Sequence, residues 1–219
     1  MIIAVEGNIG AGKSTFLKVC NIGLSNGVHV VYENVDEWTS LKDGATGLSI
    51  FDLFYQEKDK YTFVFQSYVL LSRIHAIRKA VETYPDKVIL CERSFFTDLE
   101  VFAKSLRDAN ELSDVEWQVY NRWHKLVQDV VNIPIAGQIY LRAKPCVCLE
   151  RVKTRARQSE NLITKDYLET LHNQHERWLS GSDVPTLVVD ANMNYVMNEA
   201  EAKDLCKMVD SFIDCIKET

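Results

Sequence analysis

Five short apolar stretches, several rich in β-branched residues, recur along the chain at residues 2–6, 28–33, 87–91, 137–141 and 185–189. Segments with helical apolar spacing separate nearly all of them. Nearly continuous apolar strands that alternate with helices are typical of a parallel sheet with helices on both faces. The pattern therefore predicts an α/β fold built on a central, parallel, five-stranded sheet.

Local signals refine this outline. Ser113-Asp114-Val115-Glu116 has the spacing of a capping box, so a helix is expected to begin there. Residues 39–48 contain two glycines and small polar side chains and are expected to form a loop. A last helix is expected over about 197–217, where apolar residues repeat at helical spacing.

The segment after the first strand carries the most specific motif. It matches the phosphate-loop pattern G-x-x-x-x-G-K-[ST] over Gly7, Asn8, Ile9, Gly10, Ala11, Gly12, Lys13 and Ser14, with Thr15 directly after it. The glycines let backbone N–H groups converge on an anion, and the N-terminus of the following helix adds its positive dipole end. In this motif the lysine reaches the β- and γ-phosphates of a nucleotide and the serine binds Mg²⁺, so Lys13 and Ser14 are assigned these roles.

Length and charge narrow the function. The chain has 219 residues, which suits one domain over 1–219, and its formal net charge is −6. This net charge argues against binding of polymeric nucleic acid, which usually demands a basic face, whereas a small phosphorylated ligand remains compatible. No apolar run approaches transmembrane length, and the first strand begins next to Met1. We therefore expect a cytoplasmic protein without a signal peptide or membrane segment.

The cysteines and paired histidines are expected to be structural. Because no C-x-x-C pair occurs and the cysteines fall in apolar patterns, we expect reduced core residues at Cys20, Cys91, Cys146, Cys148, Cys206 and Cys215. His172 and His175 are three apart on a helix, but no other ligand cluster accompanies them. We expect exposed helix histidines and no metal there.

Ligands on parallel sheets bind at the carboxyl ends of the strands. Glu33 follows the second strand, where it faces the γ-phosphate region and is placed to accept a proton from an attacking hydroxyl. Glu92 and Arg93 follow the third strand; the acid can organise Mg²⁺ and the arginine can neutralise charge on a transferred phosphoryl group. The alternatives are a solvated acid at Glu33 and an internal ion pair between Glu92 and Arg93.

A cluster of arginines follows the fourth strand. Arg151 and Arg155 are four residues apart, so they share a helix face and can point at one anion, and Arg157 lies nearby. Residues 151–163 are therefore a candidate arginine-rich lid over a triphosphate. A solvated basic helix face is the alternative. A nucleotide-dependent switch is disfavoured, because the chain contains neither an N-K-x-D nor a D-x-x-G string.

Together these motifs resemble the cellular-type deoxynucleoside kinases, a family that includes deoxycytidine kinase, deoxyguanosine kinase and the insect multisubstrate enzyme. The resemblance rests on GNIGAGKST, on E-x-V-x-x-W from Glu33, on residues 65–68 and 71–74, on Glu92-Arg93-Ser94, on the arginine cluster and on residues 167–172, in order along nearly the whole chain. It implies the P-loop kinase fold, a homodimer, and transfer of the γ-phosphate of ATP, with Mg²⁺, to the 5′-hydroxyl of a deoxynucleoside.

The resemblance also assigns roles to single residues. It makes Glu33 the base for the 5′-hydroxyl, Arg93 its charge partner and Glu92 the residue that assists the metal. Further roles are implied for side chains that hold the 3′-hydroxyl (Tyr55, Glu160), read the base (Gln66), wall the base pocket (Trp38, Phe102), form a pair at its far end (Arg73, Asp98) or sandwich the ATP adenine (Arg155, Tyr195). An Arg–Asp pair at that place is typical of relatives that take deoxycytidine and purine deoxynucleosides, so we expect these to be favoured over thymidine.

The chain departs from the family pattern at two places, and two rival functions are left open. Asn34 stands where the family has a proline, which leaves the exit of the second strand less rigid. No N-terminal extension like that of mitochondrial relatives precedes the first strand, which favours a cytosolic, bacterial or viral form. The rivals are a nucleoside monophosphate kinase such as thymidylate kinase, which would normally show Asp-Arg after the third strand, and a nucleotide-binding switch without transfer activity.

Overall fold

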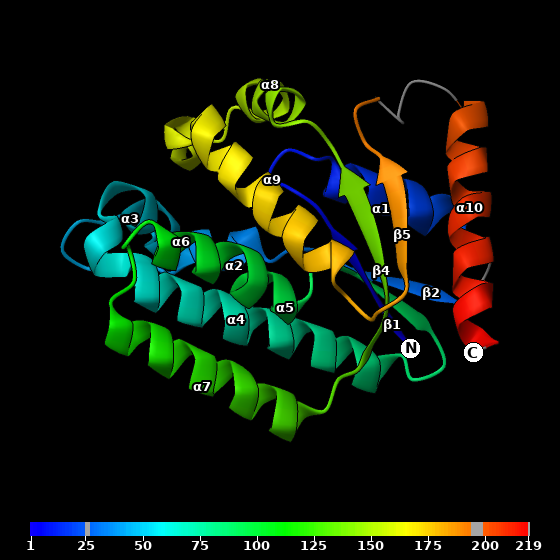
Figure 1. Cartoon of the computed structure of the whole chain (residues 1–219), viewed down its shortest axis with the longest axis horizontal. Coiled ribbons are helices and arrows are strands. Elements are labelled where there is room, and N and C mark those ends of the chain that lie inside the picture. The colour runs from blue at the N-terminus through cyan, green and yellow to red at the C-terminus, as the bar shows by residue number, and fades with distance from the viewer. Residues whose placement is uncertain (25–26, 194–198, 219) are drawn as a thin grey trace.

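The computed structural model describes residues 1–24, 27–193 and 199–218 (Figure 1). Its strands form one five-stranded sheet in the order β2-β3-β1-β4-β5, in which every neighbouring pair is parallel. The strands are β1 (Ile2–Glu6), β2 (Val28–Val31), β3 (Val88–Glu92), β4 (Ile135–Arg142) and β5 (Thr186–Asp190). The predicted α/β fold with a five-stranded parallel sheet is confirmed.

Helices connect the strands. In chain order they are α1 (Lys13–Gly23), α2 (Val35–Ser40), α3 (Ile50–Gln56), α4 (Lys58–Thr83), α5 (Phe95–Thr97), the π-helical turn η1 (Asp98–Ala103), α6 (Lys104–Asp108), α7 (Asp114–Val131), α8 (Pro145–Arg155), the 3₁₀ turn η2 (Gln158–Leu162), α9 (Lys165–Ser180) and α10 (Glu199–Lys217). The predicted capping box is present at the start of α7, where Ser113 accepts from the N–H of Glu116. Residues 41–49 form a turn closed by a bridge between Lys42 and Ser49.

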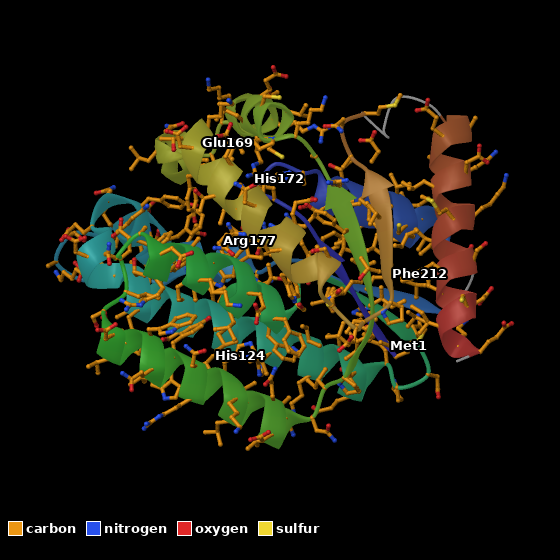
Figure 2. All side chains as sticks on the ribbon, in the orientation of Figure 1. Met1, His124, Glu169, His172, Arg177 and Phe212 are labelled. Carbon is orange, nitrogen blue, oxygen red and sulfur yellow. The ribbon has the colours of Figure 1, made fainter. Side chains whose placement is uncertain are left out.

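Alternation along β1 separates two hydrophobic cores. Ile2 and Ala4 belong to the core that includes α3, α4 and α7, whereas Ile3 and Val5 belong to the core that includes α1, α8 and α10. Figure 1 shows α10 on one side of the sheet and α4 and α7 on the other. Phe212 on α10 and His124 on α7 are labelled at these opposite sides in Figure 2. The sheet is therefore buried on both faces, as its apolar strands require.

Two expectations about individual side chains were wrong. Cys146 and Cys215 are exposed, while the other four cysteines are buried. His175 is fully buried against Tyr140, with ring centroids 5.9 Å apart, and burial lowers the pKa of His175 to about 3. Both errors arise because apolar spacing shows which face of a helix packs, but not where that face ends.

The parallel sheet brings the carboxyl ends of its strands to one edge. The loop after β1, the segment 32–34 after β2 and Arg93 after β3 all lie there, because β1 and β2 both flank β3. β2 ends at Val31, two residues earlier than expected, so that Glu33 leaves the sheet at this edge. No helix in the described part of the chain combines the length and apolar character needed to cross a bilayer.

Candidate active site

The phosphate loop has the backbone geometry that its sequence requires. Gly7, Gly10 and Gly12 have φ angles of 146°, 78° and 95°, in the region that favours glycine. A Cβ on Gly10 would lie 2.4 Å from the carbonyl oxygen of Cys148, and one on Gly7 would lie 2.8 Å from that of Leu141. The loop is thus packed tightly against β4 and α8, and only glycine fits at these contacts.

Lys13 is buried and is held by the loop itself. Its Nζ donates to the carbonyl oxygens of Gly7 and Asn8 at 3.1 and 2.8 Å. Burial, and then the nearby charge of Arg93, lower the pKa of Lys13 to about 7. A phosphate anion placed here would supply the missing negative charge and favour the ammonium form.

Ser14 and Glu92 meet at the start of α1. The Ser14 hydroxyl donates to the Glu92 carboxylate at 3.0 Å, although 78 residues separate the two in sequence. Hydroxyl and carboxylate oxygens are hard ligands of the kind that Mg²⁺ prefers, and this ion usually keeps several waters and one or two carboxylates. The two side chains therefore fit the expected metal position.

The carboxylate of Glu33 lies between two arginines. Arg93 Nη1 contacts both of its oxygens, at 2.7 and 2.8 Å, and Arg73 Nη2 contacts one at 3.0 Å. Burial acts to raise the pKa of Glu33, but the charges of Arg93, Arg73 and Lys13 outweigh it and hold this pKa at about 2. Glu33 is therefore an ionised acceptor, and Arg93 pairs with it rather than with the adjacent Glu92.

A cavity of about 370 Å³ opens between the phosphate loop, α2, α3, α4 and η1. The residues expected to touch a nucleoside all line it: Glu33, Trp38, Tyr55, Gln66, Arg73, Arg93, Asp98, Phe102 and Glu160. Phe102 packs its ring 5.1 Å from the Arg93 guanidinium carbon. Residues scattered over 128 positions of sequence, from 33 to 160, thus surround one space.

Gln66, expected to read the base, lines the cavity and has an unsatisfied side-chain oxygen. It lies on α4, is 2% exposed, and its Oε1 has no hydrogen-bond partner among the described residues. A buried polar atom without a partner is costly, so the Gln66 oxygen is a candidate acceptor for a hydrogen bond from a ligand.

Arg73 and Asp98 form the expected pair, and both line this cavity. Nε and Nη2 of Arg73 donate to the two Asp98 oxygens at 2.9 and 3.1 Å, a bidentate contact. The Asp98 side chain is fully buried in η1. Because Arg73 Nη2 also reaches Glu33, one guanidinium joins the base-pocket pair to the acceptor carboxylate.

The arginines of α8 and Arg157, which follows this helix, do not meet at one point in this structure. Arg155 donates to Glu160, as does Arg157 at 3.3 Å, while Arg151 donates to the carbonyl oxygens of Ala191 and Met193 at 2.8 and 3.0 Å. All three arginines line a second hollow of about 650 Å³ beside the phosphate loop, together with Thr15. Tyr195, expected on the adenine, lies outside the described residues.

Comparison with known proteins decides the family. The sequence model of the family described as "Deoxynucleoside kinase" matches residues 3–214. A probable deoxycytidine kinase of Fowlpox virus is 33% identical, covering 96% of this chain and 87% of that protein. Deoxycytidine kinase 1 of Xenopus laevis is 32% identical over 98% of this chain and 91% of its own, and the human deoxycytidine kinase is 31% identical over 88% and 84%. The chain belongs to the deoxynucleoside kinase family.

As a deoxynucleoside kinase, the protein is an ATP-dependent phosphotransferase, and the rival functions fall away.

The site also contains residues that sequence reasoning missed. Lys18 and Tyr32 line the cavity, and so do the aromatic side chains of Phe51, Phe54, Phe65 and Tyr167. Lys18 follows Ser14 by one helical turn, a spacing that identifies it as a neighbour of the phosphate loop. The aromatic residues have no such signal, because their pattern is also that of an ordinary core.

Proposed function

We propose that this deoxynucleoside kinase phosphorylates the 5′-hydroxyl of deoxycytidine and purine deoxynucleosides in preference to thymidine. The observation that carries the proposal is the buried, unpartnered Oε1 of Gln66, a residue that lines the same cavity as the Arg73–Asp98 pair. A side-chain amide offers a donor and an acceptor side by side, which suits the edge of adenine or cytosine. The buried pair occupies volume where the 5-methyl group of thymine would lie.

In the proposed mechanism the oxygen of the 5′-hydroxyl bonds to the γ-phosphorus of ATP while the bond between that phosphorus and ADP breaks. Glu33 accepts the proton of the hydroxyl. Because the transition state of phosphoryl transfer is loose, a carboxylate with a low pKa need only take the proton late in the step. Lys13 and Arg93 balance the charge on the phosphoryl oxygens. Ser14 and Glu92 would hold Mg²⁺, which neutralises the β- and γ-phosphates when bound.

The substrate cavity also contains partners for the sugar. Tyr55 and Glu160 line it, and we assign them to the 3′-hydroxyl, while Trp38 and Phe102 wall the base. Trp38 is fixed by donation from its indole N–H to the Ser72 hydroxyl at 2.9 Å. A rigid aromatic wall favours stacking without the cost of ordering a side chain.

The test is a specificity panel with Mg-ATP and the four common deoxynucleosides and their monophosphates, read as kcat/KM. We expect thymidine to be the poorest deoxynucleoside, by roughly ten- to a hundredfold, because each crowded or unpaired buried polar group costs about 1–3 kcal/mol. Thymidine turnover equal to that of deoxycytidine would reject the proposed preference. Turnover of monophosphates alone would reject the proposed substrate class.

We propose that residues 151–163 form a lid and that its arginines stabilise the transferring phosphoryl group. Arg155→Lys and Arg151→Lys keep the charge but lose the planar fork, so each should lower kcat more than it weakens deoxynucleoside binding. Loss of one preorganised donor is expected to cost about 10²-fold in kcat. Steady-state kinetics measure this, with Lys153→Ala as the control on the same helix. If both arginine variants keep the wild-type kcat, the cluster is a solvated surface.

We propose that two copies associate through α4 and α7, which pack side by side (Figure 1). These helices expose Val64, Leu71, Trp123, Leu126 and Val130 at 41–68%. Exposed apolar side chains on two helices that pack together are typical of an interface between copies. Leu126→Asp is expected to convert a dimer to a monomer in sedimentation velocity, whereas Ile22→Asp, at an exposed position of α1, is not. A wild-type monomer at micromolar concentration would contradict the dimer.

We place the enzyme in the cytoplasm. The supporting observation is that Cys20, Cys91, Cys148 and Cys206 are buried free thiols, as is usual where the environment is reducing.

A further inference from the structure

Glu6 is a fully buried carboxylate that the mechanism above does not use. It is the last residue of β1 and directly precedes Gly7 of the phosphate loop. Glu6 lines neither the cavity of about 370 Å³ nor the hollow of about 650 Å³ beside the phosphate loop. Burying a carboxylate is costly unless hydrogen bonds compensate, so its partners indicate what it is for.

Within the described part of the chain, the hydrogen-bond partners of the Glu6 side chain come from the segment that follows β3. Its Oε1 accepts from the backbone N–H of Ser94 at 2.9 Å and from the Ser94 hydroxyl at 2.7 Å. Its Oε2 accepts from the hydroxyl of Thr97. Glu6 thus joins β1 to a turn that lies 88 residues further along the chain.

That turn holds Arg93 in an unusual backbone conformation. The φ angle of Arg93 is 64°, in the left-handed region where a residue other than glycine is strained. Its own N–H donates to the carbonyl oxygen of Val5 at 3.0 Å, and the next N–H donates to Glu6. Val5 and Glu6, two consecutive residues of β1, therefore bind the backbone N–H groups of Arg93 and of the residue after it.

The conformation matters because of where it sends the side chain. Arg93 is 3% exposed, grips both oxygens of Glu33 through Nη1, and places Nη2 3.4 Å from the carbonyl oxygen of Gly7. A strained residue persists only when its surroundings over-determine it, and such strain clusters at active sites. Glycine would adopt this φ angle without strain. The strain at residue 93 is therefore tolerated because the site uses the arginine side chain.

We propose that Glu6 is a positioning residue, whose buried carboxylate holds the turn after β3 so that Arg93 points at Glu33 and the phosphate loop. Glu6 contacts neither the nucleoside nor the nucleotide and acts through the backbone of residues 93–94. This inference rests on the proposed roles of Arg93 and Glu33 in phosphoryl transfer.

A double-mutant cycle in the full-length enzyme tests the proposal. Glu6→Ala should lower kcat by about 10²-fold with little change in the KM for deoxynucleoside, because misplacement of a catalytic group by about 1 Å has that effect. In an Arg93→Ala background the same change should cause no further loss, because both substitutions remove one function. Additive losses, or a wild-type kcat for Glu6→Ala, would overturn the proposal.

Conservative and control variants separate positioning from stability. Glu6→Gln keeps an oxygen that accepts from Ser94, so it should retain most of the kcat even if Glu6→Ala folds poorly; a loss as large as that of Glu6→Ala contradicts the proposal. Gln138→Ala is the matched control, because Gln138 is 2% exposed on neighbouring β4 and its Oε1 accepts from Thr186. Its melting temperature should fall while its kcat remains that of the wild type; a matching fall in kcat would count against a specific role for Glu6.

A crystal structure of Glu6→Ala without substrate gives a readout that does not depend on the proposed function. We expect residue 93 to leave the left-handed region and its guanidinium to leave Glu33. A retained turn and contact would reject the positioning role, even if the wild type phosphorylates deoxynucleosides. Conversely, a wild type that phosphorylates no deoxynucleoside would reject the proposed function while this structural outcome still tests the turn.

Discussion

Replacing Glu33 by Gln is expected to lower kcat by about 10²-fold or more for every deoxynucleoside, the usual contribution of a positioned general base. The amide keeps the shape of the carboxylate but accepts no proton. It also removes the negative charge that Arg93 and Arg73 share, so both guanidinium groups lose part of their compensation. Deoxynucleoside KM should change little, because the lost interaction belongs to the transition state.

Rapid-quench measurement of the chemical step checks this prediction. Glu37→Gln is the matched control, because Glu37 undergoes the same change on neighbouring α2, where its Oε1 accepts from the Tyr68 hydroxyl at 2.8 Å. A near wild-type rate for Glu33→Gln would remove Glu33 as the base.

The pKa of about 2 adds a check, since Glu33 then stays ionised and gives no acid limb in kcat/KM at ordinary assay pH. Its contribution to stability is present above the unfolded value of 4.5 and is lost as pH falls towards 2.

Joint replacement of Arg73 by Met and Asp98 by Ala is expected to reverse the preference between thymidine and deoxycytidine. Removing the pair frees volume for the 5-methyl group and withdraws the hydrogen bonds offered to cytosine, so the ratio of the two kcat/KM values should move by roughly ten- to a hundredfold. Arg73 also contacts Glu33, and the double variant should therefore lose some kcat with all substrates. The ratio, not either value alone, is the measurement.

Replacing Arg73 alone is expected to destabilise the protein more than replacing Arg73 and Asp98 together. Arg73→Met leaves Asp98 buried without its partner, which is expected to cost about 3–5 kcal/mol of unfolding free energy. Denaturant unfolding should therefore show the single variant to be less stable than the double. Arg78→Met lies on the same helix in an exposed pair with Glu82 and serves as the control. An unchanged thymidine ratio in the double variant would show that other residues select the base.

The sequence predicted those parts of the site that depend on local spacing. The phosphate loop follows from eight consecutive residues, and Glu33 and Arg93 follow from their places at strand ends. The bond between Arg73 and Glu33 had no such signal, because 40 residues separate them and their contact depends on how α4 crosses the sheet. Glu6 was likewise hidden, since an acid at the end of a buried strand shows its role only when Ser94 and Thr97 are seen beside it.

Resemblance to a family supplied what spacing did not. Gln66 has the pattern of an ordinary buried helix residue, and only the family motif distinguished it before the structure showed its unpartnered oxygen. Neither source gave the orientation of Arg151, which the structure shows bound to backbone carbonyls of residues 191–193. Side-chain direction depends on packing around a helix, and a shared helix face does not determine it.

Three cations of the site, Lys13, Arg93 and Arg155, have polar partners within the protein itself. Lys13 contacts two carbonyl oxygens of its own loop, Arg93 holds Glu33 and Arg155 holds Glu160. Substrates therefore exchange one set of partners for another, and an exchanged hydrogen bond contributes only about 0.5–1.5 kcal/mol net. The same internal partners recapture the cations when the products depart. Self-pairing thus limits how tightly a phosphorylated product can be retained, which favours rapid turnover over high affinity.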